Sequence, residues 1–317
     1  MLESFKQLCY NIANKIKTHK GKIMKLYAPV YYKKFRCIAD KCEHSCCIGW
    51  EIDIDQNTLK KYKKLEGSYS AAIKDSISIE DAPHFKLCEG DRCPHLDERG
   101  LCKIIMNVGK DYLCDICREH PRFYNYTSVA EVGIGMSCTE AARIILSSQN
   151  YAELVEIGNI NAEADDTCFD GRVPRSEIYA ILQDSTHDYK SKLEKIHEKY
   201  SIDTGEDSRW LEALDSLEYL DIEHKKLFMN YSSKSRPEEK DEYLERFLAY
   251  FIYRHCTEAF DNDDFCDRLA FCLFCERLFA SIICSERAET LSEIAVLARI
   301  ISEEIEYSDE NTSALIY

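Results

Sequence analysis

Cysteines are the residues of this sequence whose number and spacing could do chemistry. Ten of its 17 cysteines lie between residues 37 and 138, and four of these fall within eleven positions of the stretch FRCIADKCEHSCCIGWEIDID (residues 35–55). A thiolate ligand set must bring several sulfurs within about 4 Å of one another, and short spacings in tight turns do this with little chain to order. The turn-rich stretches hold more thiols than one four-ligand site needs: Cys37, Cys42, Cys46 and Cys47, then Cys93 and Cys102, then Cys114, Cys117 and Cys138.

The compartment favours metal ligation over disulfides. The longest apolar runs, such as residues 248–253, are far shorter than the roughly 18 residues that a membrane span requires, and the start of the chain lacks an apolar segment followed by a small-residue cleavage site. We therefore expect a soluble, cytoplasmic protein. A reducing cytosol disfavours disulfides, and an odd number of cysteines is no tidy disulfide framework.

Other roles compete for individual residues. Free cysteine packs well in cores, and Cys88 and Cys114 are the candidates for that role. The pair in CLFC, residues 272–275, stands in a long apolar helical run and is also expected to be core packing. Four histidines stand among the cysteines and could serve zinc, but their spacing matches no zinc motif, so an iron-sulfur centre is favoured with zinc as the alternative. These histidines are His44, His84, His95 and His120.

The elements that must position these thiols are mostly helical by pattern. Apolar residues recur at helical spacing over residues 178–196, 211–220, 244–255 and 291–305. Alternation over residues 50–54 predicts a short strand or extended segment, and Asp55 or Asn57 is expected to cap the helix that follows. The fold class predicted is mainly α, with strand confined to short pieces. A cysteine-rich, loop-dominated metal-binding region (1–150) is expected to pack on a helical domain (151–317).

Charge is distributed unevenly. Nine Lys and Arg against one Glu give residues 1–36 a charge of +8, whereas residues 37–150 carry −4 and residues 151–317 carry −20. An acidic body argues against nucleic acid as a partner and favours solubility or a basic partner. The basic start is expected to be an amphipathic helix that turns Leu8, Ile12, Ile16 and Ile23 inward.

The cysteine motifs, together with two further stretches, resemble one known family. The matching segments are YYKKFRCIADKCEHSCCIGWEIDID, DRCPHLDERGLCKI, CREHPR, MSCTEAARIIL and LAYFIYRH. They look like those of the flagellin lysine-N-methylases of bacteria, and the resemblance runs over essentially the whole chain. The same cysteine pattern resembles, more loosely, small domains described as zinc- or iron-chelating.

The resemblance implies an enzyme that transfers methyl groups from S-adenosylmethionine to surface lysines of flagellin and that carries a 4Fe-4S cluster. Carried over by position, the implied ligand candidates rank Cys37, Cys42, Cys46 and Cys117 first. The full implied set is Cys37, Cys42, Cys46, Cys47, Cys93, Cys102, Cys117 and Cys138.

Two common methyltransferase signatures are absent from the sequence. Rossmann-type enzymes have a glycine-rich turn after the first strand. This sequence has only a single G-x-G, in EVGIGMSC, which does not match that turn. The C-x3-C-x2-C loop of radical enzymes begins at Cys42 and Cys46, but Gly49 occupies the third cysteine position. The sequence therefore leaves polar and radical transfer both open. It selects no catalytic residue and no residue that binds S-adenosylmethionine.

Two classes of function remain from the sequence. The first is the methyltransferase, with flagellin as its partner. The second is a non-catalytic zinc- or iron-sulfur-binding protein that docks a partner through its acidic half. Arg254, inside the apolar FIYRH segment, is expected to form a buried ion pair with a neighbour such as Glu258.

Overall fold

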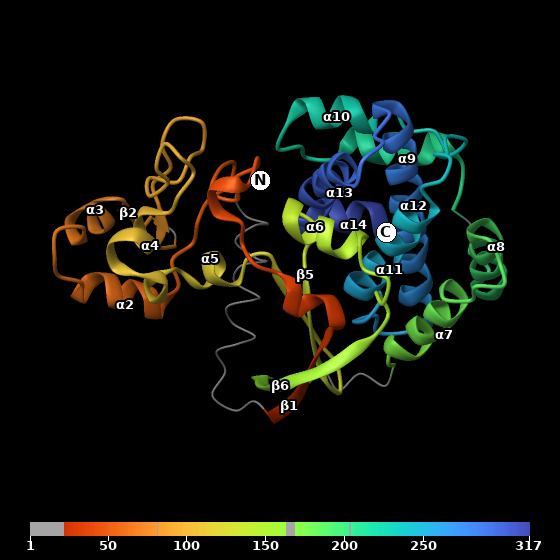
Figure 1. Ribbon diagram of the computed structural model, residues 1–317, viewed down its shortest axis with the longest axis horizontal. Helices are drawn as coiled ribbons and strands as arrows, with labels where there is room; N and C mark the ends of the chain where they lie inside the picture. The colour runs from red at the N-terminus through yellow and green to blue at the C-terminus, as the bar shows by residue number, and fades with distance from the viewer. Residues whose placement is uncertain (1–21, 81, 163–168, 203) are drawn as a thin grey trace. The chain divides into compact units, whose positions relative to one another are not determined.

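The computed structural model describes residues 22–80, 82–162, 169–202 and 204–317. These residues form two compact units, shown in Figure 1. Unit 1 comprises residues 36–121, and unit 2 comprises residues 22–35 and 122–317. This division differs from the 1–150 and 151–317 division expected from the sequence, because strands on both sides of residue 150 pair in one sheet.

About half of the described residues are helical, as expected, but the strand content exceeds the expectation. Unit 2 contains a four-stranded mixed sheet whose longest strands have eight and nine residues. The segment 50–54 is no strand, since it contributes only an isolated bridge between Asp53 and His84. Of the expected N-terminal helix, residues 8, 12 and 16 lie outside the described residues, while Ile23 lies in strand β1 (Lys22–Pro29) and is 75% exposed.

Unit 1 is built from short elements around a small apolar core. Ile52, Leu59, Ile73 and Phe85 are among the residues buried in that core. The elements of unit 1 are η2 (Ala39–Lys41), α2 (Gln56–Lys64), α3 (Ser70–Asp75), β2 (Ile77–Ser78), β3 (His84–Phe85), α4 (Lys103–Val108), η3 (Lys110–Tyr112) and α5 (Asp115–Glu119).

Helix α2 begins where the sequence predicts. Asp55 is its N-cap, and one oxygen of the Asp55 side chain accepts hydrogen bonds from the Asn57 and Thr58 amides, at 3.1 and 3.0 Å. These bonds satisfy backbone donors that the first turn of a helix otherwise leaves unpaired. The other oxygen accepts from the Asp115 amide at 3.0 Å, so the same side chain fastens the start of α5.

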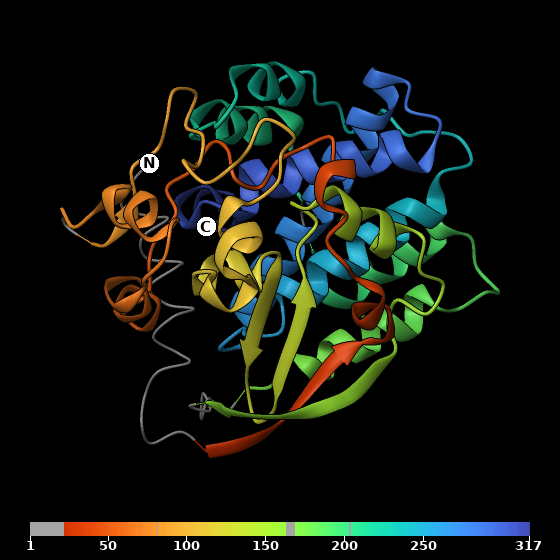
Figure 2. The same cartoon turned by 60° about the vertical axis from the view of Figure 1, so that its left-hand side comes forward.

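The sheet of unit 2 has the strand order β4-β5-β1-β6. β1 pairs with β5 in parallel, whereas β6 with β1 and β4 with β5 are antiparallel. Figure 2 shows the four strands side by side. A bulge interrupts the β1–β6 register at Gly158, whose φ of +154° is uncommon for other residues. The strands are β1 (Lys22–Pro29), β4 (Arg122–Tyr126), β5 (Ala130–Ile134) and β6 (Leu154–Ala162).

The helices of unit 2 confirm the helical periodicity seen in the sequence. The apolar sets predicted to be helical fall in α7, α8, α9, α11 and α13, except that α9 ends at Ser216, so Leu217 and Leu220 lie beyond it. The remaining members of the unit are η1, α6, α10, α12 and α14. Their bounds are η1 (Val30–Lys34), α6 (Thr139–Leu146), α7 (Arg172–Leu182), α8 (Tyr189–Tyr200), α9 (Asp207–Ser216), α10 (Ile222–Phe228), α11 (Asp241–His255), α12 (Asn262–Glu286), α13 (Leu291–Glu306) and α14 (Asp309–Ile316).

The core of unit 2 surrounds α11 and α12. Most residues of α12 between Phe265 and Ile283 are buried, as expected for a helix that is apolar on nearly every side. Cys272 and Cys275 are fully buried there, which confirms the core-packing prediction for CLFC. At the sheet, Gly133 of β5 leaves room for aromatic packing, because a Cβ at this position would lie 2.3 Å from the Phe123 ring.

Buried ion pairs join distant parts of unit 2. Arg175 of α7 holds Glu131 of β5 through two hydrogen bonds of 2.6 and 2.7 Å, with both side chains almost fully buried. Arg254 is also in a buried pair, as expected, but its partner is Glu306 on α13 rather than Glu258. One turn beyond Arg254 the chain has left α11, and the Glu258 side chain accepts from the Tyr126 amide.

We expect Asp55→Ala to loosen two segments of unit 1, since one carboxylate serves both α2 and α5. The loss of the cap should lower the free energy of unfolding of unit 1 by about 1–2 kcal/mol. Hydrogen exchange should then be faster both in α2 and at residues 113–117. Asp188→Ala removes the cap of α8 in unit 2 and serves as the matched control. Faster exchange confined to the first turn of α2 would contradict the expectation.

We expect Arg175→Met to destabilise unit 2 strongly, because it leaves the Glu131 carboxylate buried without its cation. Losses of this kind are about 3–5 kcal/mol. The double variant Arg175→Met/Glu131→Leu should recover most of that loss, since it removes both charges. Urea unfolding of the two variants and of the unaltered protein measures the difference. A double variant as unstable as the single one would show that shape, not charge, decides this contact.

Candidate functional site

Thiols from separate segments of unit 1 lie close enough to affect one another's ionisation. The hydrogen bond with Cys114 raises the pKa of the Cys117 thiol, and burial and the charges of Cys114, Cys47 and Cys93 raise it further. Burial raises the pKa of Cys93 to about 11, with the charges of Cys102 and Cys114 adding to the effect. The sulfurs that interact in this way are here called the thiol group, which comprises Cys46, Cys47, Cys93, Cys102, Cys114 and Cys117.

The remaining members join the group through similar interactions. The hydrogen bond with Cys47 is the largest cause that raises the pKa of Cys46. Burial raises the pKa of Cys102, and the charges of Cys114 and Cys46 contribute. In each case burial and the charge of a neighbouring cysteine contribute, because a thiolate loses hydration on burial and is repelled by a second thiolate nearby. A positively charged metal centre would reverse that preference and favour the thiolates.

Backbone pairing explains why the first two cysteine segments meet. The Cys93 amide donates to the Cys47 carbonyl at 2.9 Å, and the Gly49 amide donates to the Asp91 carbonyl at 3.1 Å. An isolated antiparallel bridge between Ile48 and Arg92 lies between these bonds. The CC pair and the segment leading to Cys93 are therefore held side by side.

A turn brings Cys102 back toward Cys93. The Asp97 side chain accepts from the amides of Arg99 and Leu101, at 2.9 and 2.8 Å, and Gly100 takes the positive φ of +77° that the turn requires. An antiparallel bridge between Leu96 and Cys102 closes the turn. The turn formed by DERG is thus the local reason that the chain returns toward Cys93 at Cys102.

Helix α2 fixes the segment that carries Cys114. The Lys61 ammonium donates to the Asp111 carbonyl at 2.9 Å, and the Tyr62 hydroxyl donates to the Tyr112 carbonyl at 2.6 Å. The Tyr62 hydroxyl also lies 3.6 Å from the Cys114 sulfur. Together with Asp55, these side chains hold residues 111–115 along one face of the helix.

Both ring nitrogens of His95, the histidine nearest to Cys93 in sequence, are already engaged. Nδ1 lies 2.9 Å from the Tyr69 hydroxyl, and Nε2 lies 2.9 Å from the Ser76 hydroxyl. Burial lowers the pKa of His95 to about 4, so the ring is neutral near pH 7. His84 likewise places Nδ1 2.8 Å from the Ala82 carbonyl. Because both histidine rings already have hydrogen-bond partners, sulfur is favoured over imidazole nitrogen as the metal ligand of this unit.

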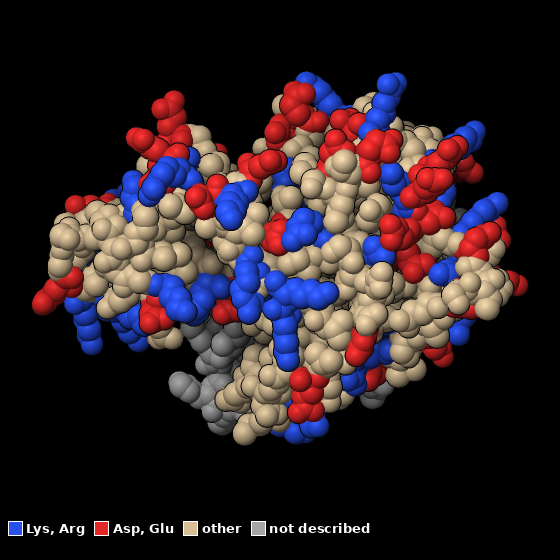
Figure 3. All heavy atoms as spheres, viewed as in Figure 1, with Lys and Arg blue, Asp and Glu red and all other residues tan. Residues whose placement is uncertain are grey.

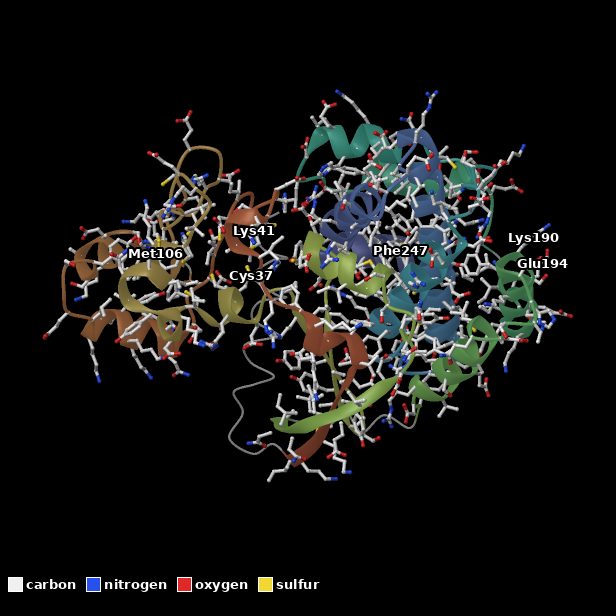
Figure 4. All side chains as sticks on the ribbon, viewed as in Figure 1. Cys37, Lys41, Met106, Lys190, Glu194 and Phe247 are labelled. Atoms are coloured by element: carbon white, nitrogen blue, oxygen red, sulfur yellow. The ribbon has the colours of Figure 1, made fainter. Side chains whose placement is uncertain are left out.

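The donor chemistry of the thiol group fits a thiolate-bound metal, because soft sulfur ligands suit zinc and iron-sulfur clusters. In the described part of the chain, no three Cys, His, Asp or Glu side chains stand close enough together to hold a metal ion as placed. Binding would therefore require the thiols to close around the metal. Figure 4 shows sulfur atoms in this unit, with Cys37 and Met106 labelled.

Five of the eight ligand candidates implied by the resemblance belong to the thiol group: Cys46, Cys47, Cys93, Cys102 and Cys117. Cys37 is exposed, and the Cys42 thiol lies 2.7 Å from the His44 carbonyl. Cys138 is the N-cap residue of α6 in unit 2. As metal ligands, all eight candidates stay predictions.

Cys114 is the member of the thiol group that the sequence reading assigned to core packing. It is buried, as predicted, but its sulfur interacts with Cys117. The Cys114-x2-Cys117 spacing was the signal that could have identified it. Cys88, the other residue expected in the core, is exposed.

Unit 2 contains a separate polar network built from two of the motif segments. The Met136 amide, at the start of MSC, donates to the Tyr250 hydroxyl at 3.1 Å, and Tyr250 donates to Glu306 at 2.9 Å. Arg254 and His255 contact the other oxygen of Glu306, at 3.1 and 2.7 Å. Burial by itself would raise the pKa of Glu306, but Arg254 and His255 outweigh it and hold the carboxylate ionised. The network is internally paired and identifies no catalytic base.

Helices of the described residues include none that is long and apolar enough to cross a membrane. No family model matches the chain, and no solved structure matches it. Curated relatives do match. The lysine-N-methylases of Salmonella typhimurium and Salmonella choleraesuis are each 29% identical over 136 residues, which cover 40% of this chain and 34% of each relative.

A shorter relative, the flagellar biosynthetic protein FliU of Salmonella muenchen, is 28% identical over 136 residues, covering 40% of this chain and 80% of FliU. The chain thus spans about a third of the length of the two lysine-N-methylases that it matches. All three relatives match this chain over 136 residues. Over about 40% of its length, the chain is homologous to the lysine-N-methylases and FliU of Salmonella.

Proposed function

We propose that this chain methylates lysine side chains of flagellin, with S-adenosylmethionine as the methyl donor. The observation that carries the proposal is the homology to proteins named lysine-N-methylase and flagellar biosynthetic protein. The homology covers 40% of this chain, so the activity of the whole relatives is proposed here rather than transferred.

We further propose that the thiol group holds a metal centre, a 4Fe-4S cluster in the first instance. Such clusters take four cysteine thiolates, and the six thiols of the group exceed that number. Its ligands are drawn from Cys46, Cys47, Cys93, Cys102, Cys114 and Cys117, with Cys37, Cys42 and Cys138 as further candidates. When bound, the cluster would supply redox chemistry or hold the thiol-bearing turns together.

Zinc is the alternative metal, because it too binds four thiolates. The engaged nitrogens of His95 and His84 count against a mixed histidine-cysteine zinc site but not against an all-cysteine one. The colour of the bound metal separates the two directly, since zinc is colourless and iron-sulfur clusters are brown.

The protein must also present a neutral lysine amine to the methyl carbon. Desolvation or a neighbouring base lowers the pKa of such an amine, and alignment with the methyl group then permits transfer. The acidic excess of residues 151–317 would attract lysine-bearing surfaces. On the face drawn in Figure 3, acidic side chains gather over the region where Figure 1 places α9 and α10.

A second candidate function is a non-catalytic metal-binding protein that docks a partner. The observation that favours it is the thiol group itself. These thiols support metal binding, but they give no evidence for a residue that transfers methyl groups. Binding of S-adenosylmethionine separates the two functions, because only the methyltransferase requires it.

For the metal, we expect protein purified without oxygen to be brown and to contain iron. Cys93→Ala and Cys117→Ala should each remove most of the iron, because each deletes a central member of the thiol group. Cys284→Ala, a half-buried cysteine on α12 of unit 2, is the matched control and should keep it. Metal analysis and visible absorption give the readout. Colourless protein with stoichiometric zinc would decide for the alternative metal, and iron retained in both variants would exclude the thiol group as its site.

For the activity, we expect flagellin co-expressed with this chain to gain mass increments of methyl groups on lysine. Flagellin expressed alone is the control, and peptide mass spectrometry locates the modified lysines. Calorimetry with S-adenosylmethionine on anaerobically prepared protein supplies the second readout. Unmodified flagellin together with no binding of S-adenosylmethionine would reject the methyltransferase and favour the docking protein.

A further inference from the structure

Apolar side chains are exposed on and beside α10 of unit 2. Of the exposed large apolar residues in the described part of the chain, three fall within ten positions: Leu220, Ile222 and Met229, which are 42%, 62% and 36% exposed. Ile222 and Met229 are seven residues apart, about two helical turns, so they lie on one side of α10. Another side of the helix packs inward through Phe228, which is fully buried. Helix α10 therefore has apolar side chains on both its inner and its outer surface.

Two buried side chains hold the segment that leads into α10. The Glu304 carboxylate of α13 accepts hydrogen bonds from the Leu220 and Asp221 amides, at 2.8 and 3.2 Å. Asn311 of α14 accepts from the Glu218 amide at 3.0 Å and donates to the Glu218 carbonyl at 2.7 Å. The backbone is thus fixed from its inner side, and the exposed apolar side chains keep their outward direction.

The surroundings of these apolar residues are acidic. Residues 206–229 contain seven Asp and Glu against three Lys and Arg, a net charge of −4. Acidic side chains gather over the region where Figure 1 places α9 and α10, as Figure 3 shows. Five of these acids are exposed: Glu212, Asp215, Glu218, Asp221 and Glu223.

The two lysines of α10 do not reverse this charge, because each is held by a carboxylate. Lys225 lies 2.9 Å from the Asp215 carboxylate, and Lys226 lies 2.6 Å from the Glu223 carboxylate. The surface that remains combines exposed apolar side chains with an excess of negative charge. It is complementary to a surface whose apolar side chains stand among lysines.

We propose that Leu220, Ile222 and Met229, with the exposed acids around them, form a docking face for a lysine-bearing surface of the methylation substrate. This inference rests on the proposed function, under which the substrate is flagellin, and it adds the place where the substrate is held. Apolar side chains at the centre of such a face supply affinity when the partner excludes water from them, and the acidic charges speed encounter with its lysines. Because the face is fixed in advance, its ordering costs little when the partner binds.

Purified monomeric flagellin is the probe for the docking face. Its binding to the full chain is measured by calorimetry, and its methylation is followed by mass spectrometry over a range of flagellin concentrations. Ile222→Ser removes the most exposed apolar side chain of the face. Val173→Ser is the matched control, because Val173 is 60% exposed on α7 of the same unit. Circular dichroism establishes that each variant is folded.

A second pair of variants tests the charge. Glu223→Gln removes an acid beside Ile222, and Glu194→Gln removes one on α8, labelled in Figure 4. These two glutamates are matched, since each side chain is 67% exposed and each faces a lysine of its own helix. Both pairs of variants are measured at low and at high salt.

We expect Ile222→Ser to raise the Kd and the KM for flagellin on the order of 10-fold, the effect of losing one well-buried contact of an interface. The kcat at saturating flagellin should stay unchanged, because the face holds the substrate without touching the reacting amine. Glu223→Gln should weaken binding roughly 2- to 5-fold and make it less sensitive to salt. Val173→Ser and Glu194→Gln should change none of these quantities.

The outcomes separate the docking face from the proposed function. Flagellin that binds and is methylated equally well by Ile222→Ser and Val173→Ser would overturn the docking face and leave the methyltransferase standing. Flagellin that Ile222→Ser binds more weakly, but that no form of the protein methylates, would support the face and reject the methyltransferase. Flagellin that is neither bound nor methylated would reject both.

Two further measurements complete the test. Met229→Ser replaces Ile222→Ser if the latter does not fold, with the same expected direction in Kd and KM. Analytical ultracentrifugation of the unaltered protein and of Ile222→Ser reports self-association. A dimer that Ile222→Ser dissociates, with flagellin binding unchanged, would assign the face to a second copy of this chain and overturn the inference.

Discussion

The hydrogen bonds from α2 and its N-cap to residues 111–115 are the constraint on which the arrangement of unit 1 depends. Asp55, the N-cap of this nine-residue helix, and Lys61 and Tyr62 within it each hydrogen-bond to this segment. Without these partners, residues 111–115 would have many conformations. Ordering the backbone of each residue costs roughly 1–2 kcal/mol in entropy. The helix supplies fixed partners for those backbone groups, so Cys114 and Cys117 are presented to the other thiols in one arrangement.

The other thiols reach the same place by backbone pairing rather than by side chains. The Cys47 carbonyl accepts from the Cys93 amide, and the turn at Asp97 returns the chain to Cys102. Unit 1 has only a small apolar core, which limits how much stability packing alone can supply. A metal bound by the thiols would couple its binding free energy to the folding of these turns. The proposed metal would therefore stabilise the unit as well as supply its chemistry.

Unit 2 uses buried charge where unit 1 uses sulfur. The pair Glu131–Arg175 joins residues 44 positions apart, and the pair Arg254–Glu306 joins residues 52 positions apart. A buried carboxylate tolerates few alternatives, because any other packing would leave the charge without its partner. The Glu306 network brings together the MSC and FIYRH segments, two of the stretches on which the resemblance to the methylases rests. The structure thus gives both segments a shared structural role, whatever chemistry they also perform.

The sequence by itself determined the features that depend on local pattern. The helical periods, the Asp55 cap and the burial of Cys272 and Cys275 follow from spacing and residue type, and the cysteine motifs pointed to the methylases that the comparisons also found. Only the tertiary structure decided the rest. The mixed sheet joins β1 to β5 and β6 across more than a hundred residues, a pairing that no local pattern encodes. Likewise, Cys114 joins the thiol group and Arg254 pairs with Glu306, because long-range packing, not neighbouring sequence, decides which groups meet.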